Sequence, residues 1–329
     1  MVIAHKKYIV ELSKTMKSLA TVFTLLFIVS GFAATIATTD ARANVKPDFR
    51  NERPGTKDII KARFDVRPGG TLYIDIDRGS IIIEASGDDE VYVELERDIR
   101  GVSSEEEKKI LEQHEYDISQ DGNNVVVESR FDDDGNGSWS WKKLHRKKKF
   151  KLTVTIRVPE RFNIDFENGA GNVEIEDLEG MVVGRTGAGN IVIGDINGPV
   201  DISSGAGNIN IESVVGYVDV RTGAGNITID EVAGEINAQT GAGNVVATVT
   251  RQPREDSDLG TGAGNVTVYL ADDIAVDVEA HSSLGSASCD FDLRVKGKWM
   301  SKSFGGELNG GGPSLTLHSG VGNVSLKRY

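Results

Sequence analysis

The most constraining feature of this sequence is the tetrapeptide Gly-Ala-Gly-Asn, which recurs with a fixed period. Five copies follow one another at intervals of 18 residues, a sixth follows after 21 residues, and a Gly-Val-Gly-Asn variant begins at Gly320. A unit this short cannot fold alone, so each copy must bury its apolar residues against its neighbours. The first Gly and the Asn of the copies are Gly169 and Asn172, Gly187 and Asn190, Gly205 and Asn208, Gly223 and Asn226, Gly241 and Asn244, and Gly262 and Asn265.

The apolar residues keep the same period. Counted from the first Gly, they occupy positions 5, 7, 10, 14 and, less strictly, 16, as in Ile209, Ile211, Val214, Val218 and Val220. A spacing of two is typical of a strand with one buried face, and β-branched residues favour strands. A helix would lose about 1 kcal/mol at each of its recurrent glycines. We therefore predict an all-β fold, a single-stranded β-helix-like solenoid of 18-residue coils stacked about 4.8 Å apart in parallel register.

The recurrent asparagines are predicted to be structural. Asn tolerates a left-handed corner, and stacked Asn side chains can hydrogen-bond from coil to coil. A phosphate-binding loop would need one glycine-rich turn that opens a helix, and here a strand follows each copy.

Residues 1–43 are predicted to be a signal peptide. Lys14 and Lys17 precede a mostly apolar stretch over residues 19–36, and Ala41 and Ala43 supply the small residues of a cleavage site. Met16 is an alternative start, and an uncleaved anchor is the alternative to cleavage. We expect an exported protein that is not an integral membrane protein after cleavage, and that is periplasmic, secreted or on the cell surface of a bacterium.

The net charge limits the kinds of partner that the chain can bind, and the cysteine content limits its disulfides. Removal of residues 1–43 takes away five positive and two negative charges, so the net charge falls from −13 to about −16. An acidic chain repels nucleic acid and anionic lipid, and no nucleic-acid partner is predicted. Cys289 is the only cysteine, so it cannot form an internal disulfide and is expected to fill apolar space.

The remaining chain divides into three predicted parts. Residues 44–60 form a linker, and residues 61–160 form N-terminal strands with a helical and basic insertion that caps the solenoid. Residues 161–329 form the repeat solenoid, which is interrupted at about 284–312 and ends in closing coils. Ser103 and Glu106 fit a capping box, which predicts one short helical insertion near residues 103–116.

A basic and aromatic segment is the sharpest local candidate for binding. Such a segment can bind anionic glycans, lipid headgroups or a protein partner. The alternative is a solvated loop whose charge is neutralised by the aspartates at 132–134. The residues of the segment are Trp139, Trp141, Lys142, Lys143, Arg146, Lys147 and Lys148.

Outward-facing carboxylates are the second candidate. Stacked carboxylates repel one another, and a hard cation such as Ca²⁺ could relieve that repulsion. Their columns are irregular, however, and the nine-residue calcium-binding repeat is absent, so a solvated acidic face is favoured. No cofactor, metal or catalytic residue is predicted. The carboxylates are Glu176, Asp177, Asp195, Asp201, Glu212, Asp219, Asp230 and Glu231.

Several phrases of the sequence resemble one bacterial family. They are the stretch 69–72 (Gly-Gly-Thr-Leu), the stretch 157–159 (Arg-Val-Pro), the serial Gly-Ala-Gly-Asn corners, and the closing stretches 305–312 and 322–326. Over residues 60–329 the chain resembles the bacterial "putative adhesin" family of β-strand-repeat proteins, which is related to the head-type domains of auto-transporter adhesins. The resemblance implies the repeat fold and no catalytic motif.

These observations predict a non-enzymatic exported solenoid, an adhesin-like or envelope scaffold that interacts with an envelope or surface glycan or protein. The alternative is a polysaccharide-acting β-helix enzyme, a lyase or glycosidase, that uses the outward carboxylates. The oligomeric state stays open.

Overall fold

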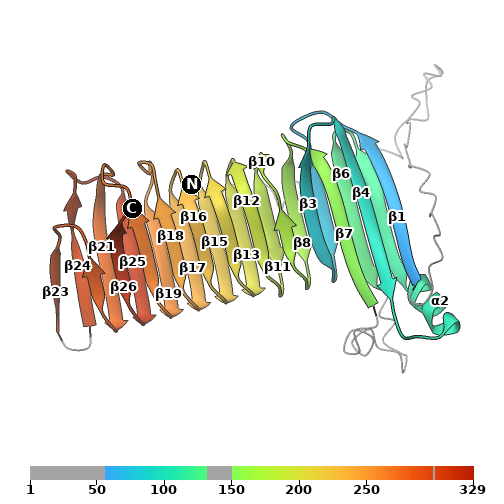
Figure 1. Cartoon of the computed structure of the whole chain (residues 1–329). Helices are drawn as coiled ribbons and strands as arrows, with labels where there is room; N and C mark the ends of the chain where they lie inside the picture. Colours follow the sequence, from blue (N-terminus) through green and yellow to red (C-terminus); the bar gives the residue numbers. More distant parts are fainter. Residues whose placement is uncertain (1–55, 132–149, 299–300) are drawn as a thin grey trace, which may run out of the picture. The chain divides into compact units, whose positions relative to one another are not determined.

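The computed structural model describes residues 56–131, 150–298 and 301–329, and these residues are mostly β (Figure 1). Two long sheets, called sheet A and sheet B here, run side by side, and their strands are mainly parallel where the repeats lie. In order across sheet A, the strands are β1 (Thr56–Asp65), β4 (Glu90–Ile99), β7 (Phe150–Pro159), β3 (Ser80–Ser86), β9 (Val173–Ile175), β12 (Ile191–Asn197), β14 (Ile209–Val214), β16 (Ile227–Val232), β18 (Val245–Val249), β20 (Val266–Leu270), β26 (Val324–Arg328) and β22 (Ala287–Cys289), with β10 (Leu178–Glu179) paired to β12.

Sheet B contains the other strand of each repeat. In order across sheet B, the strands are β23 (Arg294–Lys298), β24 (Ser301–Leu308), β21 (Val276–Leu284), β25 (Ser314–Val321), β19 (Ser257–Ala263), β17 (Ile236–Ala242), β15 (Val218–Ala224), β13 (Val200–Ala206), β11 (Val182–Thr186), β8 (Asn163–Asn168), β2 (Thr71–Ile76), β6 (Asn124–Phe131) and β5 (His114–Asp121).

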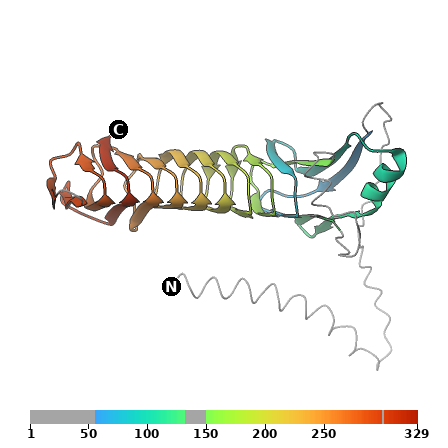
Figure 2. The ribbon, with the colours of Figure 1, turned by 90° about the horizontal axis from the view of Figure 1, so that it is seen from below.

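The repeats contribute strands to both sheets, and the strand pairs between the 18-residue copies join residues 18 apart. In sheet A, Ile191 pairs with Ile209, and in sheet B, Val200 pairs with Val218. The view in Figure 2 shows the successive repeats as a series of similar turns along the two sheets. We call the strands from β8 to β20 the stack.

The predicted apolar positions point into the space between the two sheets. Position 5 is an unbroken row of buried side chains, from Val173 through Ile191, Ile209 and Ile227 to Val245, each no more than 1 % exposed. Positions 7, 10 and 14 form equivalent rows. Because fully burying one such aliphatic side chain contributes about 1.5–3 kcal/mol, these rows supply much of the driving force for folding.

The backbone of the corner differs from the expectation. The third residue of the tetrapeptide has a positive φ, as at Gly189 (141°) and Gly207 (143°), a region that only glycine enters freely. Among the described residues Asn309 is the only non-glycine with positive φ, so the repeated asparagines are not left-handed. Their side chains instead accept from the next coil: Asn208 N–H donates to Asn190 Oδ1 at 3.0 Å, and Asn226 N–H to Asn208 Oδ1 at 2.9 Å.

A buried hydroxyl precedes every corner after the first, and in several coils it has a second structural role. The Thr222 hydroxyl donates to the carbonyl of Gly207 at 3.1 Å, and the Thr240 hydroxyl donates to that of Gly225 at 2.8 Å. Each bond satisfies a backbone acceptor in the preceding coil, which would otherwise be costly to bury. The sequence analysis did not identify this column, although Thr or Ser stands directly before the tetrapeptide in every copy from the second onward.

Antiparallel strands extend both sheets at the N-terminal end. β1, β4 and β7 continue sheet A, while β5 and β6 continue sheet B. β1 begins at Thr56, inside the segment expected to be a linker, because its residues pair with β4 along their whole length. Helix α2 (Ser104–Glu112) is capped by Ser103, whose hydroxyl accepts from Glu106 N–H at 3.2 Å. The helix ends before Tyr116 because the chain enters β5 at His114.

The C-terminal strands do not simply close the stack. β25 pairs with β19 on one side and with β21 on the other, and β26 lies between β20 and β22. The last repeat is therefore inserted between two earlier segments of the chain. The asparagine row continues through it, since Asn323 N–H donates to Asn265 Oδ1 at 2.9 Å.

Among the described residues, no helix is both long and apolar enough to cross a membrane.

Candidate functional site

The basic and aromatic segment of residues 139–148 lies outside the described residues, so its role stays a prediction. Cys289 lies in β22, half-buried against the core, and burial raises the pKa of its thiol. The described part of the chain offers three further groups of polar side chains: a carboxylate group on sheet A, a mixed polar face on sheet B, and a buried network at the N-terminal end.

Three of the predicted outward carboxylates meet on sheet A. Carboxylate oxygens of Asp177, Asp195 and Glu212 lie within 4.8 Å of one another, beside an open groove of about 680 Å³ that Glu160 and Glu179 also line. The Asp195 N–H donates to Asp177 Oδ1 at 2.8 Å, so Asp177 also joins two neighbouring coils. Oxygen donors of this kind suit Ca²⁺, but all three side chains are exposed, and solvation accounts for them equally well.

The mixed polar face lies on the outer side of sheet B. We call it the Tyr217 face: it contains Tyr217, Asp219 and Arg221 around β15, with two residues each from the neighbouring strands β13 and β17. Asp201 and Asn237 stand beside Asp219 in register, and Ser203 and Gln239 stand beside Arg221.

Asp219 is the centre of the Tyr217 face. Its Oδ2 accepts from the Tyr217 hydroxyl at 3.1 Å and from Arg221 Nη2 at 2.8 Å. Its Oδ1 is buried and has no partner, although the residue lies on the outer side of the sheet and is 9 % exposed. A buried acceptor without a donor is unfavourable, and it disfavours the ionised form of the Asp219 carboxyl group.

Burial and neighbouring charges shift the pKa values of two groups on this face, Asp219 and Tyr217. Burial raises the pKa of Asp219 and Asp201 adds to this, against the opposing effects of Arg221 and the Tyr217 hydroxyl. Burial and the neighbouring Asp219 raise the pKa of Tyr217 to about 12, so its hydroxyl remains a donor at neutral pH. The face is thus a negatively charged surface with an exposed aromatic ring.

A second groove adjoins this face. It has a volume of about 700 Å³ and runs along β2, β8, β11 and β13, with Ser203 common to the groove and the Tyr217 face. Glu167 and Arg185 line it, together with the ion pair between Asp75 and Arg130. The outer side of sheet B therefore offers a continuous polar surface across several strands.

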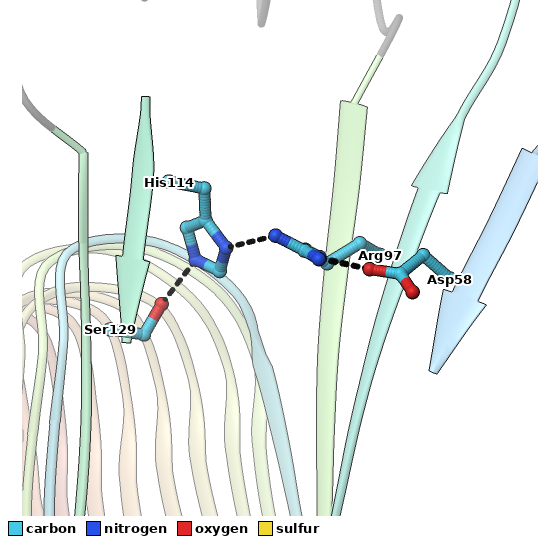
Figure 3. Close-up of polar contacts among 4 residues, drawn as sticks. All are labelled: Asp58, Arg97, His114 and Ser129. Atoms are coloured by element: carbon cyan, nitrogen blue, oxygen red, sulfur yellow. Dashed lines mark hydrogen bonds and ion pairs between the residues drawn. The ribbon is translucent and has the colours of Figure 1, made fainter. Parts of the chain in front are cut away.

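The buried network joins the two sheets at the N-terminal end (Figure 3). Arg97 on β4 forms an ion pair with Asp58 on β1, with Arg97 Nε donating to Asp58 Oδ2 at 2.7 Å. On its other side Arg97 Nη1 lies 3.4 Å from His114 Nδ1, and His114 Nε2 lies 2.8 Å from the Ser129 hydroxyl. Burial, followed by the charge of Arg97, lowers the pKa of His114 to about 3, so the imidazole is neutral.

The network resembles a hydrolytic triad in composition but not in its hydrogen bonding. Arg97 can only donate, so His114 Nδ1 must accept and the ring proton resides on Nε2. Nε2 then donates to Ser129 and cannot take a proton from it, as a general base must. All four side chains are buried as well. The arrangement therefore bridges the sheets and does not activate Ser129.

Sequence reasoning had identified Asp201 and Asp219 only as outward carboxylates, and it missed Tyr217, Arg221 and the whole buried network. The signal for the Tyr217 face is the alternation over residues 217–221, in which three polar residues are separated by two valines. The network offers no such signal, because its members come from four separate strands.

Two sheets, whose parallel strands come from one repeated unit, define the class of this protein. It is a β-strand-repeat protein with an aliphatic interior and polar outer faces. The family model "Toastrack DUF4097" matches residues 71–327, and the chain belongs to this family.

Among solved structures, three bacterial proteins are similar to this chain at low identity. A "putative cell adhesion protein" from Clostridium sporogenes ATCC 15579 is 12% identical with a TM-score of 0.29, covering 86% of this chain and 100% of that one. "Putative adhesins" from Bacteroides fragilis NCTC 9343 and Parabacteroides distasonis ATCC 8503 are 14% and 10% identical, with TM-scores of 0.39 and 0.40, and each match covers 82% of this chain and 97% of the other. These likenesses carry no argument about function. No curated protein matches.

Proposed function

We propose that this chain is an exported, non-catalytic interaction protein of the bacterial envelope or cell surface, whose β-solenoid of 18-residue coils presents rows of polar side chains to a partner. The observation that carries the proposal is the in-register pairing of β13, β15 and β17, which fixes the outward residues of neighbouring coils side by side. A rigid array of this kind loses little conformational entropy on binding, and this favours recognition of an extended partner.

The surroundings of the polar groups support binding more than catalysis. An enzyme site needs to exclude water and to place a base beside a reacting group. The two grooves described above are open, and the histidine of the buried network is turned into a donor by Arg97.

The test is binding of the purified exported chain to whole bacterial cells, cell-wall fractions and a glycan array. We expect saturable binding to at least one of these surfaces. Substitution of the Tyr217 face, as in Asp201→Asn with Arg221→Gln, should weaken the binding, whereas Glu212→Gln on sheet A should leave it unchanged. Absence of binding to every surface would contradict the proposal.

Export is part of the proposal and can be tested separately. Mass spectrometry of the mature protein should show an N-terminus at Asn44, after removal of residues 1–43, and cell fractionation should place the chain outside the cytoplasm. The same mass spectrum would identify an uncleaved anchor. For the chain after residue 43, we further propose a linker at residues 44–60, an N-terminal end unit at residues 61–160 and the solenoid at residues 161–329.

A glycosidase or lyase is the second candidate. It is favoured by the raised pKa of Asp219 beside the Asp201 carboxylate, because a carboxyl group with a raised pKa and a neighbouring carboxylate are the two groups of glycoside hydrolysis. Turnover of polysaccharides that is abolished by both Asp201→Asn and Asp219→Asn would establish this function in place of simple binding.

A further inference from the structure

The connection from sheet A to sheet B at the N-terminal end has few contacts with the interior. Residues 101–113 leave β4 of sheet A, form helix α2 and enter β5 of sheet B at His114. We call residues 101–113 the strap, and Figure 2 shows its helix at the opposite end of the ribbon from the C-terminus. Within the strap Ile110 alone is buried, at 2% exposure. A segment that buries so little can open locally while the rest of a protein stays folded.

His114 holds the end of the strap against both sheets. The residue is 4% exposed, and the centre of its ring lies 4.5 Å from that of Phe131 and 5.8 Å from that of Phe150. Its Nδ1 contacts Arg97 of sheet A, and its Nε2 contacts Ser129 of sheet B (Figure 3). One titratable side chain therefore joins the strap to the two sheets.

This network requires a neutral imidazole. Nδ1 accepts from Arg97 and Nε2 donates to Ser129, so both ring nitrogens are used in one tautomer. A second proton would turn Nδ1 into a donor that faces the donating Nη1 of Arg97 at 3.4 Å. It would also place two positive charges side by side in a buried position, which is unfavourable.

The described groups that pack around the ring leave such a proton uncompensated. Arg97 on β4 repels it, and the Asp58 carboxylate on β1 is already paired with Arg97. The contacts on β6 and β7 are with the Ser129 hydroxyl and with two phenylalanine rings, none of which carries charge. The neighbouring carboxylates of Glu112 and Glu115 are exposed to solvent. Burial and Arg97 accordingly lower the pKa of His114 to about 3.

We propose that the strap is an acid-released closure of the N-terminal end: when His114 takes up a second proton, its side chain leaves the network and the strap detaches, while the stack stays folded. Release uncovers Ile110 and the two aromatic rings that now pack on His114. The chain would then present an apolar surface in acid that it covers at neutral pH. This inference is independent of the proposed function.

The direction and size of the effect follow from linkage. The open strap binds a proton with the ordinary pKa of histidine, 6.5, and the closed strap with a pKa of about 3. The open form is therefore protonated first as the pH falls, and between these values each pH unit favours opening by about tenfold. From pH 7 to pH 4 the opening constant should rise on the order of 100-fold.

Hydrogen exchange of the purified full chain, read by mass spectrometry at pH 7 and pH 4 and corrected for the intrinsic exchange rate, measures this opening. We expect peptides from the strap and the start of β5 to lose protection on the order of 100-fold at pH 4. Peptides from β12 to β18 should keep theirs. Between pH 6 and pH 4 the opening constant of the strap should change with the slope of a single proton.

Two variants assign the effect to His114. In His114→Gln the side-chain amide can still accept from Arg97 and donate to Ser129, but it does not titrate, so the strap should stay protected at pH 4. His281→Gln, which replaces an exposed histidine on β21, is the matched control and should respond to acid as the unmodified chain does. The carboxylates of the strap titrate in all three proteins, so their contribution is common to them.

Equal strap protection at the two pH values would overturn the inference. So would an identical loss of protection in His114→Gln and the unmodified chain, or a loss that appears in β12 to β18 at the same pH. If His114→Gln fails to fold by circular dichroism, the one-proton slope of the unmodified chain decides the question, and a slope near zero refutes the role of His114.

Discussion

In the middle of the stack, from β12 to β18, the buried inward-facing side chains are aliphatic or carry a small hydroxyl group, whereas the N-terminal end encloses an arginine, an aspartate and a histidine. The difference follows from what each region has for neighbours. A repeat in the stack has a nearly identical coil on both sides, so the same kind of bond recurs from coil to coil, as in the Asn226 N–H to Asn208 Oδ1 bond and the Thr240 hydroxyl to Gly225 carbonyl bond. The end strands have no second copy and join the sheets through a single network of specific partners.

This comparison teaches that the two regions have different weak points. The stack distributes its stability over many similar contacts, as expected for a repeat structure whose coils interact mainly with their neighbours. The end region concentrates its polar stabilisation in one ion pair and one histidine. Perturbations that remove charge should therefore affect the end far more than the stack.

The largest effect is expected from Arg97→Ala. The substitution leaves the Asp58 carboxylate buried at 2% side-chain exposure without its partner, and breaking a buried pair in this way costs about 3–5 kcal/mol. Chemical denaturation measures the change in unfolding free energy. Lys57→Ala, which removes an ion pair to Glu96 between the same two strands with side chains 55% and 29% exposed, is the control and should cost far less.

A similar but slightly smaller loss is expected from Ile209→Ala in the stack. This residue is fully buried in the position 5 row, and truncation of a buried Ile to Ala costs about 2–5 kcal/mol through lost burial and the cavity left behind. Denaturation of the variant beside Asn210→Ala, the exposed neighbour on the same strand, separates core packing from strand propensity. An equal, small effect of both changes would contradict the assigned core.

The third prediction concerns pH. His114 has a folded-state pKa of about 3, below its value of about 6.5 in an unfolded chain. The unfolded chain therefore binds a proton first as pH falls, so the contribution of His114 to stability is fully present above about pH 6.5 and declines toward pH 3. Between pH 6.5 and 5 the slope should approach about 1.4 kcal/mol per pH unit for this single group.

Comparison with His114→Gln isolates this contribution, because the carboxylates titrate in both proteins. The variant should show a flatter dependence of unfolding free energy on pH over that interval. Parallel curves for the two proteins would mean that His114 is not held neutral by burial and Arg97.

The smallest effect is expected from Asn226→Ala. Asn226 Oδ1 accepts from the Asn244 N–H at 2.9 Å and from Asn244 Nδ2 at 3.2 Å, both at the exposed corner. Loss of this acceptor should cost about 1 kcal/mol, which is typical of one hydrogen bond. Thermal denaturation beside Thr228→Ala, an outward residue of the same coil, measures the difference, and equal melting temperatures would show that the asparagine row is not stabilising.

Most of the stack could be predicted from the sequence, but little of the N-terminal end could. Ile191, Ile209 and Ile227 could be placed inside because the same residue type recurs at the same position, so each copy confirms the phase of the next. The left-handed residue could not be assigned from the pattern alone, because Gly207 and Asn208 are adjacent and both tolerate turns. Only the backbone geometry shows that the glycine takes the positive-φ conformation and the asparagine supplies the hydrogen bond.

The polar groups escaped prediction for a different reason. Asp58, Arg97, His114 and Ser129 stand on four strands separated by a helix and turns, and no regular spacing links them. On the Tyr217 face the alternation of polar residues was visible in the sequence. The unpaired oxygen of Asp219 was not, because it depends on how Tyr217 and Arg221 share the other oxygen.

The placement of β25 and β26 between segments made earlier has a consequence for biogenesis. Residues 314–329 are synthesised after β21 and β22, yet these two strands have no parallel neighbour toward β19 and β20 until residues 314–329 arrive. Coils up to β20 can assemble in chain order, while the far end must wait for residues 314–329. A chain that lacked these residues would keep exposed strand edges between β19 and β21 and between β20 and β22, and such edges are sites of misassembly and aggregation.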